Sequence, residues 1–446
     1  MDPIGIIPSF GNFFYTAVAF VVALSVIVSI HEFGHYIVGR WSGIHAEVFS
    51  LGFGPKLWSR IDKRGTRWQI AALPLGGYVK FLGDANAASA GADQATMLAL
   101  SPDERRHTLH GAPLWARAAT VVAGPLFNFI LSILIFSAMF LYAGTPTDKP
   151  VIGDFHTLPG GSGQIEVGDT ILAIEGTPTP DWEALMVAVD TLPAKDPLTY
   201  RILRNGKELT LTGPSIYPAR ADNIVPGSAA ADAGLKRDDV IVAADGSPVW
   251  RFADLQTAVK AAEGRPVLLS VWRAGKTFEV TLSPRKTDQP TADGGFETRY
   301  LIGLSGAVFF DPATRKVGPV EAVKGAGLQT WVIAKSSVSG LWHIITGSIS
   351  SCNLRGPLSI AEVSGAAASQ GSSDFIWFIA VLSTAVGLMN LFPIPMLDGG
   401  HLVFHAYEWA TGRPLPDSVL NVVMMAGLFV VLSLMGFGLF NDFSCP

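Results

Sequence analysis

One short stretch of the chain holds three residues whose types and spacing could do chemistry. His31, Glu32 and His35 form the pattern His-Glu-x-x-His, directly after an uncharged run, Phe13–Ile30. On a helix, residues i and i+4 lie on one face about 6 Å apart, so both imidazoles could bind one zinc ion. Glu32 could accept a proton from an activated water molecule and pass it to a leaving amine. Placing ionisable groups at the end of a membrane-spanning segment costs free energy, and such groups usually have a function. We therefore predict a metal site here.

A tetrahedral zinc site needs a third protein ligand, which must come from elsewhere in the chain. A later apolar run, Phe375–Phe392, is followed by Pro393 and Pro395, which break its helix, and then by Asp398. From spacing alone, Asp398 competes for the third position with three other residues: His401, His405 and Glu408. His401 and His405 are themselves an i, i+4 pair, although no Glu follows the first histidine.

The composition favours a membrane protein over a soluble one. Of the 446 residues, 49% are hydrophobic and 15% are charged, whereas soluble domains carry about 25% charged residues. The mean hydropathy is +0.36. The net charge of −5 gives no support for nucleic-acid binding, and two cysteines exclude a cysteine-rich zinc module. Crossing a bilayer takes about 20 mostly apolar residues, and four runs meet or approach that length: Phe13–Ile30, Ala118–Ala143, Phe375–Phe392 and Val419–Phe440.

Positive charge predicts the orientation of these spans. Residues 1–39 contain no Lys or Arg, whereas residues 32–117 contain ten. Because cytoplasmic segments collect positive charge, we expect 32–117 and the loop around Arg413 inside. The amino terminus, 144–374 and the tail after Phe440 are then outside. The first run has no Lys or Arg before it and no small-residue cleavage site after it, so we interpret it as a span and not a signal peptide.

The two cysteines, Cys352 and Cys445, both fall outside in this topology. A disulfide between them is consistent with an oxidising compartment, and two free thiols are equally consistent. Their spacing along the chain does not decide between these alternatives.

The region 144–300 is predicted to be mixed α/β and contains an internal repeat. Gly168–Pro178 aligns with Asp238–Pro248, and in each copy a strand pattern leads into a Gly-x-Pro turn, a helix (Trp182–Val189; Phe252–Ala262) and two strands joined by a hairpin turn. The second copy begins with Val225–Leu235, which resembles the bacterial type of PDZ domain, a module that binds peptides by strand addition. Leu301–Leu304 is a candidate loop for a peptide carboxylate, and an ordinary glycine turn fits it equally well. The first copy lacks the full Pro-Gly-Ser stretch.

Three further segments have a predicted structure. Residues 47–82 contain a hairpin, with Leu57–Ile61 and Thr66–Ile70 on either side of a turn, and a segment of this kind beside a membrane can dip into it. The Ala-rich residues 85–97 are predicted to be a mobile loop. Residues 327–350, with Trp331 and Trp342, are predicted to form an interfacial helix.

Taken together, these motifs resemble the site-2 protease family, in the arrangement of the RseP-type bacterial intramembrane metalloproteases. The resemblance rests on His31-Glu32-x-x-His35, on Gly124-x-x-x-Asn128, on the sequence from Asn390 through Pro393 and Pro395 to Asp398-Gly399, and on the two PDZ-like repeats, and it covers nearly the whole chain. It implies a zinc endopeptidase that cuts within membrane helices, with Asp398 as the third zinc ligand. It also implies that Asn390 binds the substrate chain near the metal and that 47–82 is a membrane-associated β-loop that helps to engage substrate.

The resemblance further implies substrates and a location. The substrates would be single-span membrane proteins already trimmed outside the membrane, such as an anti-sigma factor in regulated intramembrane proteolysis, or signal-peptide remnants. The PDZ-like domains would bind peptide or protein ligands and act as a size filter or as a reader of substrate tails. The protein would lie in the bacterial inner membrane, with its active site near the cytoplasmic side, its PDZ-like domains in the periplasm and no nucleic-acid partner.

The expected fold is therefore a multi-span α-helical membrane protein with four transmembrane helices, a membrane-associated β-hairpin segment and two mixed α/β PDZ-like domains. The expected organisation along the chain is as follows: 1–46, first transmembrane helix with the zinc motif; 47–82, β-loop; 83–117, cytoplasmic loop and interfacial segment; 118–143, second transmembrane helix; 144–214, first PDZ-like domain; 215–310, second PDZ-like domain; 311–374, periplasmic connector with an interfacial helix; 375–398, third transmembrane helix; 399–418, cytoplasmic loop; 419–446, fourth transmembrane helix and tail.

Two other functional classes compete with the protease. One is a non-enzymatic membrane scaffold whose PDZ-like pair gathers partners, with His31 and His35 buried for structural reasons. Metal analysis separates it from the enzyme, because only the enzyme should hold zinc that is lost on His35→Ala. The other is a metal transporter, which is disfavoured because four spans with a ligand pair at one helix end offer no polar path across the membrane.

Overall fold

The computed structural model describes residues 6–85, 91–290 and 296–445. The chain divides into two compact units, which are described separately. The first unit comprises Met1–Ala138, Pro319–Trp342 and Leu354–Ser444, and the second comprises Met139–Gly318, His343–Asn353 and Cys445–Pro446.

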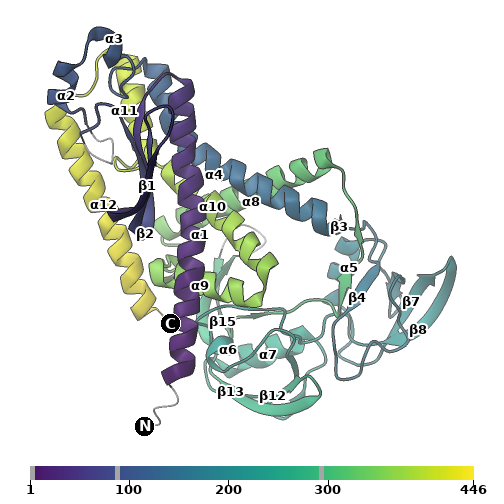
Figure 1. The fold of residues 1–446 in the computed structure, drawn as a ribbon. Helices are drawn as coiled ribbons and strands as arrows, with labels where there is room; N and C mark the ends of the chain where they lie inside the picture. Colours follow the sequence, from purple (N-terminus) through teal and green to yellow (C-terminus); the bar gives the residue numbers. More distant parts are fainter. Residues whose placement is uncertain (1–5, 86–90, 291–295, 446) are drawn as a thin grey trace. The chain divides into compact units, whose positions relative to one another are not determined.

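Four helices in the described part of the chain are long and apolar enough to cross a membrane. The four predicted runs are thus confirmed as helices, the only open-ended structure that satisfies its own backbone groups in lipid. The first helix continues beyond the predicted run, so that the His-Glu-x-x-His pattern lies on it. The four, labelled in Figure 1, are α1 (Ile6–Trp41), α4 (Leu114–Ala143), α10 (Ser372–Asn390) and α12 (Asp417–Ser444).

The predicted hairpin of residues 47–82 is confirmed as β1 (Ala46–Ile61) and β2 (Arg67–Phe81). Both strands bend, and β1 does so at two glycines with positive φ, Gly52 and Gly54. The hairpin therefore folds on itself, because Phe49 pairs with both Trp68 and Val79, and Trp68 pairs also with Arg60. Four segments lie side by side in the order 56–61, 67–71, 46–51 and 77–81.

The folded hairpin packs against the second half of α1. Tyr36 of that helix shares a buried apolar cluster with Phe49, Val79 and Phe81 of the hairpin. The Tyr36 ring lies edge-on to the indole of Trp68, with 5.0 Å between their centroids. The hairpin is thereby held beside the part of α1 that carries the His-Glu-x-x-His pattern.

The prediction of a mobile loop at 85–97 is wrong for its last part. Gln94–Ala99 forms the short helix α2, and the Asp93 carboxylate caps it by accepting hydrogen bonds from the backbone N–H groups of Ala95 and Thr96. This N-cap stabilises a helix in an Ala-rich run that lacks apolar periodicity. Residues 86–90 of the predicted loop lie outside the described residues.

The remaining helices include one at the predicted interfacial segment. This is α8 (Pro319–Ile345), on which Trp331 and Trp342 are 66% and 63% exposed. Its helical structure is confirmed, and its place at an interface stays a prediction. The others are α3 (Pro102–Arg105), α5 (Trp182–Val189), α6 (Ala229–Asp232), α7 (Phe252–Ala262), the short 3-10 helix η2 (Ser351–Asn353), α9 (Pro357–Gln370) and α11 (Asp398–Thr411).

The second unit contains two four-stranded antiparallel sheets with the same strand order. The first is β6-β5-β7-β8 and the second is β11-β10-β12-β13. Helices α5 and α7 occupy the predicted places, so the internal repeat is a repeat of topology. Their assignment as PDZ-like domains stays a prediction. The strands are β5 (Thr170–Ile174), β6 (Thr177–Pro178), β7 (Leu198–Arg204), β8 (Lys207–Gly213), β10 (Val240–Ala244), β11 (Ser247–Pro248), β12 (Val267–Arg273) and β13 (Lys276–Leu282).

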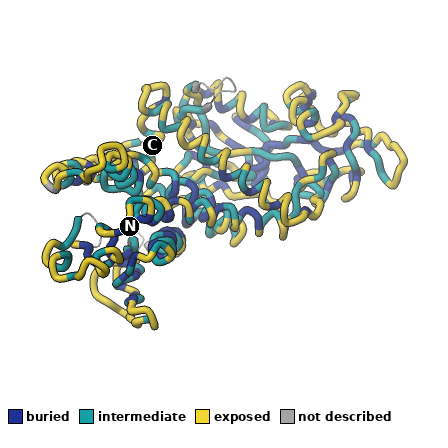
Figure 2. Tube along the Cα trace, turned by 90° about the horizontal axis from the view of Figure 1, so that it is seen from above, coloured by how far each residue is buried: buried dark blue, intermediate teal, exposed yellow. Residues whose placement is uncertain are grey.

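Each sheet has its own apolar core. Figure 2 shows buried stretches, in dark blue, along the Cα trace. Cys352 and Cys445 are joined by a disulfide, so of the two alternatives left open by the sequence, a disulfide or two free thiols, the structure has the disulfide. Short strands complete the unit. The short strands are β3 (Thr145–Pro146), β4 (Ile152–Phe155), β9 (Asn223–Ile224), β14 (Arg285–Pro290), β15 (Phe296–Leu301), β16 (Leu304–Ser305), β17 (Phe310–Pro312) and β18 (Thr314–Arg315).

Candidate metal centre

Helix α1 places His31 and His35 on one face, as the spacing predicts. Their Nε2 atoms lie 3.1 Å apart, and the two rings meet edge to face with 4.8 Å between their centroids. Helix α4 closes over them at Gly124, where an added Cβ would lie only 2.3 Å from Nε2 of His35 and 2.8 Å from Cε1 of His31. A glycine is therefore needed at this position for α4 to pass so close to the two imidazoles.

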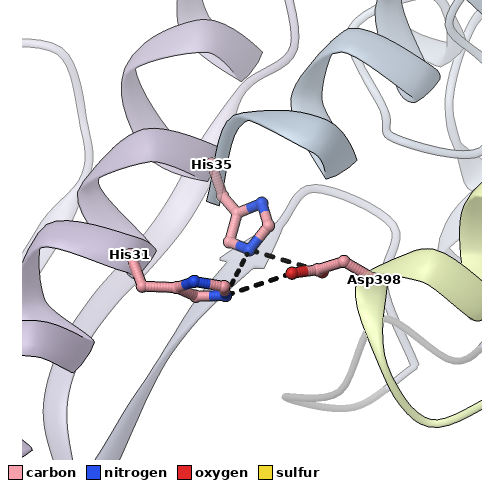
Figure 3. A group of neighbouring side chains, drawn as sticks. All are labelled: His31, His35 and Asp398. Carbon is pink, nitrogen blue, oxygen red and sulfur yellow. Dashed lines mark hydrogen bonds and ion pairs between the residues drawn. The ribbon is translucent and has the colours of Figure 1, made fainter. Parts of the chain in front are cut away.

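Asp398 reaches the same place from the other end of the chain. Helix α10 ends at Asn390, and α11 begins at Asp398 itself after the two prolines. Gly399 and Gly400 let this first turn pack on the preceding loop, because a Cβ at either position would lie 2.3 Å from a backbone carbonyl oxygen of that loop. The Asp398 carboxylate then points at both imidazoles, as Figure 3 shows.

The three side chains make a compact set of donor atoms. Nε2 of His31 lies 3.1 Å from Oδ2 of Asp398, and Nε2 of His35 lies 3.5 Å from Oδ1. One ligand atom from each residue can be chosen so that all three lie within 4.8 Å of one another. Of the four candidates for the third position, the structure thus brings Asp398 to the histidines.

The chemistry of this donor set fits a divalent cation. Nδ1 of His35 donates to the carbonyl oxygen of Thr120 at 2.8 Å, so a neutral His35 presents a lone pair on Nε2. That lone pair converges with Nε2 of His31 and with the Asp398 carboxylate, whose Oδ2 lies 3.1 Å from the His31 ring and accepts no hydrogen bond from elsewhere in the described residues. Two imidazoles and one carboxylate are a common ligand set of catalytic zinc, with one place left for water.

Helix α4 also orients His31. The side-chain amide of Asn128 lies 3.2 Å from Nδ1 of His31, and Asn128 is fully buried. Its backbone carbonyl oxygen accepts hydrogen bonds from the hydroxyls of Ser132 and Ser383, which hold this turn of α4 in place. With its oxygen turned toward Nδ1, the Asn128 amide would accept the proton of that ring atom, and a partner of this kind fixes the ring orientation of a metal-binding histidine and raises its affinity for metal.

Thr120 as a partner of His35 was missed by reasoning from the sequence. Thr120, Gly124 and Asn128 are four residues apart and so form one stripe along α4. The four-residue spacing of these residues could have indicated, from the sequence alone, that one face of the second span contacts the two histidines.

Glu32 lies next to the two histidines and is not one of the three converging residues. The folded hairpin lies beside its side chain. The hairpin approaches closely at Gly77, where an added Cβ would lie 3.3 Å from Cγ of Glu32. The hairpin therefore positions the predicted acid–base group.

Asn390 does not join the cluster. It is the last residue of α10, and its amide donates back along that helix to the carbonyl oxygen of Val386 at 3.0 Å. To contact a substrate chain, the amide would have to turn away from this bond.

The three competing residues of α11 have other surroundings. Glu408 forms a two-point ion pair with Arg117, with N–O distances of 3.0 and 2.6 Å. Burial lowers the pKa of His401, and burial together with the nearby Arg117 guanidinium lowers the pKa of His405 to about 4. Neither imidazole belongs to the set of converging ligand atoms found among the described residues.

Comparison with known proteins shows which family this chain belongs to. The family model described as peptidase family M50 matches residues 19–434, a range that begins inside α1 and ends inside α12. The chain belongs to peptidase family M50.

Relatives of this M50 peptidase match along nearly its whole length. It is 34% identical over 464 residues to the regulator of sigma-E protease RseP of Escherichia coli K12, covering 97% of this chain and 99% of the relative. It is 35% identical over 457 residues to the regulator of sigma E protease of Salmonella typhimurium LT2, covering 96% and 98%. It is also 36% identical over 431 residues to a protein of Agrobacterium fabrum provisionally named zinc metalloprotease Atu1380, covering 96% and 95%.

These matches establish the class of the protein. This M50 peptidase is an RseP-like intramembrane zinc metalloprotease, and it is a multi-span membrane protein. The scaffold and transporter alternatives are therefore excluded as its main activity.

Proposed function

We propose that this M50 peptidase hydrolyses peptide bonds within the transmembrane segments of membrane proteins, at a zinc ion held by His31, His35 and Asp398. The observation that supports this most directly is the convergence of these three side chains from the first span and from α11. Glu32 lies beside them on α1, where the acid–base group of a His-Glu-x-x-His site is expected.

Zinc, when bound, polarises the peptide carbonyl and activates a water molecule. The Glu32 carboxylate accepts a proton from that water and later donates it to the leaving amine. The hairpin, which lies against the Glu32 side chain at Gly77, limits the positions of the carboxylate for both transfers. Thr120 and Asn128 hold the two imidazoles so that their Nε2 atoms face the carboxylate of Asp398.

A helical substrate must unwind before its peptide groups can be attacked, and the freed groups need hydrogen-bond partners in lipid. The hairpin segment 77–81 lies at the edge of the folded sheet and beside Glu32, so it can pair with an extended substrate. The Asn390 amide is a second candidate partner. The hairpin also exposes large apolar side chains, which suit a position in the membrane: Leu57 is 71% exposed, Trp58 52%, Ile61 59% and Leu73 53%.

The location and the substrates follow from the charge asymmetry and from the relatives. Positive charge in 32–117 favours a cytoplasmic position for that segment and for the catalytic end of α1, in the bacterial inner membrane. The two topological repeats, 144–214 and 215–310, would then be periplasmic PDZ-like domains that bind peptide or protein ligands and exclude substrates not yet trimmed. The substrates would be single-span proteins, such as an anti-sigma factor or signal-peptide remnants.

The experiment is cleavage of a single-span substrate by the purified full-length protein in proteoliposomes, with the products sequenced. We expect Glu32→Gln to keep its zinc and to lose activity by about 10²–10⁴-fold, the usual contribution of a general acid–base group. Glu362→Gln is the matched control, because Glu362 is an exposed residue of α9 and does not belong to the cluster. Asp398→Asn should lose most of the bound zinc. Retained cleavage by E32Q, or full zinc content in D398N, would reject these roles.

A further inference from the structure

A second site lies just beyond the catalytic end of α1. An open cavity of about 390 Å³ is lined by the end of that helix, the start of β1, the hairpin turn and the segment around α3. All of these elements belong to the first unit. The polar side chains that line the cavity are those of Arg40, His45, Arg64, Thr66, Glu104 and His107.

Most of the ionisable groups in this lining are basic. Arg40 uses one nitrogen, Nη1, which donates to the Tyr36 hydroxyl and lies 4.0 Å from the Asp62 carboxylate. Within the described residues, no hydrogen bond or ion pair is seen for its other guanidinium nitrogens, or for the side chain of Arg64. Two guanidinium groups are therefore available to one ligand in the cavity, and guanidinium matches the oxygens of phosphate in a two-point fashion.

The other polar side chains of the lining do not reverse the positive charge of the two arginines. Nδ1 of His107 donates to the carbonyl oxygen of Gly43 at 2.7 Å, which leaves Nε2 as the second polar atom of that ring. The carboxylate of Glu104 is the one acidic group of the lining, and its Oε2 is engaged by the backbone N–H and the hydroxyl of Ser101. The guanidinium groups of Arg40 and Arg64 outweigh this single carboxylate.

The cavity lies where a membrane surface is expected. Trp41, the residue after Arg40, ends α1 and is 75% exposed, and Trp115 in the first turn of α4 is 65% exposed. Exposed tryptophans at the ends of spans mark the headgroup level of a bilayer. Basic pockets at this level are suited to the phosphate of anionic lipids.

We propose that this cavity binds a phosphate group, through Arg40 and Arg64, with His45 and His107 beside it. A ligand held there bridges the end of α1 and the turn of the hairpin. Because the hairpin also contacts Glu32, the bound phosphate steadies the geometry of the catalytic end of α1; this consequence rests on the proposed function, whereas the binding itself does not. Both an anionic lipid headgroup and a soluble phosphate can supply this chemistry.

Binding is tested on the full-length protein by native mass spectrometry in detergent, with phosphatidylglycerol compared with phosphatidylcholine, and by titration with inorganic phosphate. The Arg64→Gln variant should bind roughly 10- to 100-fold more weakly, the effect of removing one charge-assisted hydrogen bond. Lys63→Gln is the matched control, since Lys63 is the adjacent exposed residue of the same turn and does not line the cavity. The double variant Arg40→Gln/Arg64→Gln should abolish binding. If the double variant does not fold, the single variant Arg64→Gln still tests the proposal, because Arg64 is exposed.

The lipid comparison and the phosphate titration together distinguish a lipid headgroup from a soluble phosphate compound as the ligand. Preference for phosphatidylglycerol that depends on Arg64 and not on Lys63 supports a headgroup site. Inorganic phosphate binding with the same dependence, without lipid preference, supports a site for a soluble phosphate compound. Equal losses of binding in K63Q and R64Q would overturn the proposal. So would a protein that neither prefers phosphatidylglycerol over phosphatidylcholine nor binds inorganic phosphate. Zinc content and unfolding temperature, measured in each variant, separate a binding defect from a folding defect and are independent of cleavage activity.

Discussion

Nδ1 of His31 lies 3.2 Å from the side-chain amide of Asn128, across the contact between the first two spans. A histidine that binds metal through Nε2 carries its proton on Nδ1 and donates it to an acceptor. The Oδ1 atom of Asn128 is buried and has no hydrogen-bond partner among the described residues. Turning the amide over would therefore supply the acceptor that a metal-bound His31 requires.

This relationship gives the first prediction. Asn128→Leu removes the acceptor and should weaken zinc binding by about 10–100-fold, the usual cost of losing such a partner. Asn128→Asp keeps an acceptor for the Nδ1 proton and should retain zinc within a few-fold of the wild-type affinity. Competition with a chelator measures both. Equal affinities for N128L and the wild type would contradict the assigned role of the amide.

A second prediction concerns Gly124. In Gly124→Ala the new methyl group would overlap both imidazoles, so the ligands would have to move. A displacement of about 1 Å in a catalytic group can cost about 10²-fold in rate, and we expect a loss of that order together with a loss of zinc.

The matched control for this change is Gly436→Ala. Gly436 lies in α12, is exposed and has no atom within 4 Å of an added Cβ. Alanine is the better helix former, so G436A should leave zinc content and activity unchanged. Full activity in G124A would show that α4 is not closely packed on the histidines.

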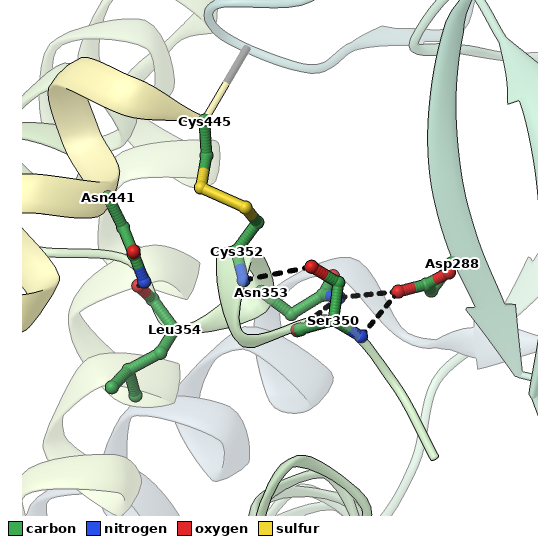
Figure 4. Close-up of a disulfide and its surroundings, with 7 residues drawn as sticks. All are labelled: Asp288, Ser350, Cys352, Asn353, Leu354, Asn441 and Cys445. Carbon is green, nitrogen blue, oxygen red and sulfur yellow. Dashed lines mark hydrogen bonds between the residues drawn. A yellow bond between two sulfur atoms is a disulfide. The ribbon is translucent and has the colours of Figure 1, made fainter. Parts of the chain in front are cut away.

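The disulfide gives a third prediction. Cys352 and Cys445 are 93 residues apart in sequence, and in Figure 4 the disulfide lies next to Ser350 and Asn353, which both donate to the Asp288 carboxylate. Closing a segment of this length stabilises a protein by about 4 kcal/mol in the chain-entropy account. A reductant should therefore lower the unfolding temperature of the wild type by a few degrees.

Activity should survive reduction. The end of α12 is held independently by Asp442, whose carboxylate accepts hydrogen bonds from the backbone N–H groups of Gly356 and Leu358 at 2.8 and 3.0 Å. The Cys352→Ser/Cys445→Ser variant is the control, because its unfolding temperature should no longer respond to reductant. An unchanged wild-type unfolding temperature on reduction would show that the cross-link contributes no stability.

A fourth prediction concerns pH. Burial and the Arg117 guanidinium lower the pKa of His405 from its ordinary value near 6.5 to about 4. Between these values the unfolded chain binds this proton and the folded protein does not, so stability falls as the pH drops from about 6.5 toward 4. His405→Gln removes this contribution. Its unfolding temperature should decline less over that range than the wild-type value, and parallel declines would refute the assignment to His405.

The sequence alone determined the features that depend on local spacing and on length. Uncharged runs of sufficient length identified four helices, and the i, i+4 spacing placed His31 and His35 on one helix face. The turn between Ile61 and Thr66 identified the hairpin. The repeat predicted two matching sheets. Where local periodicity was weak, the prediction failed, as at α2, whose helix depends on the Asp93 cap.

Only the tertiary structure decided what depends on contacts between distant segments. Spacing left Asp398 in competition with His401, His405 and Glu408, and the family resemblance favoured it. The folded chain brings its carboxylate to the histidines and pairs Glu408 with Arg117. The disulfide, the closeness of Gly124 to His35 and the contact of the hairpin with Glu32 are of the same kind. Such convergence is fixed by packing between elements, which no local pattern of residues records.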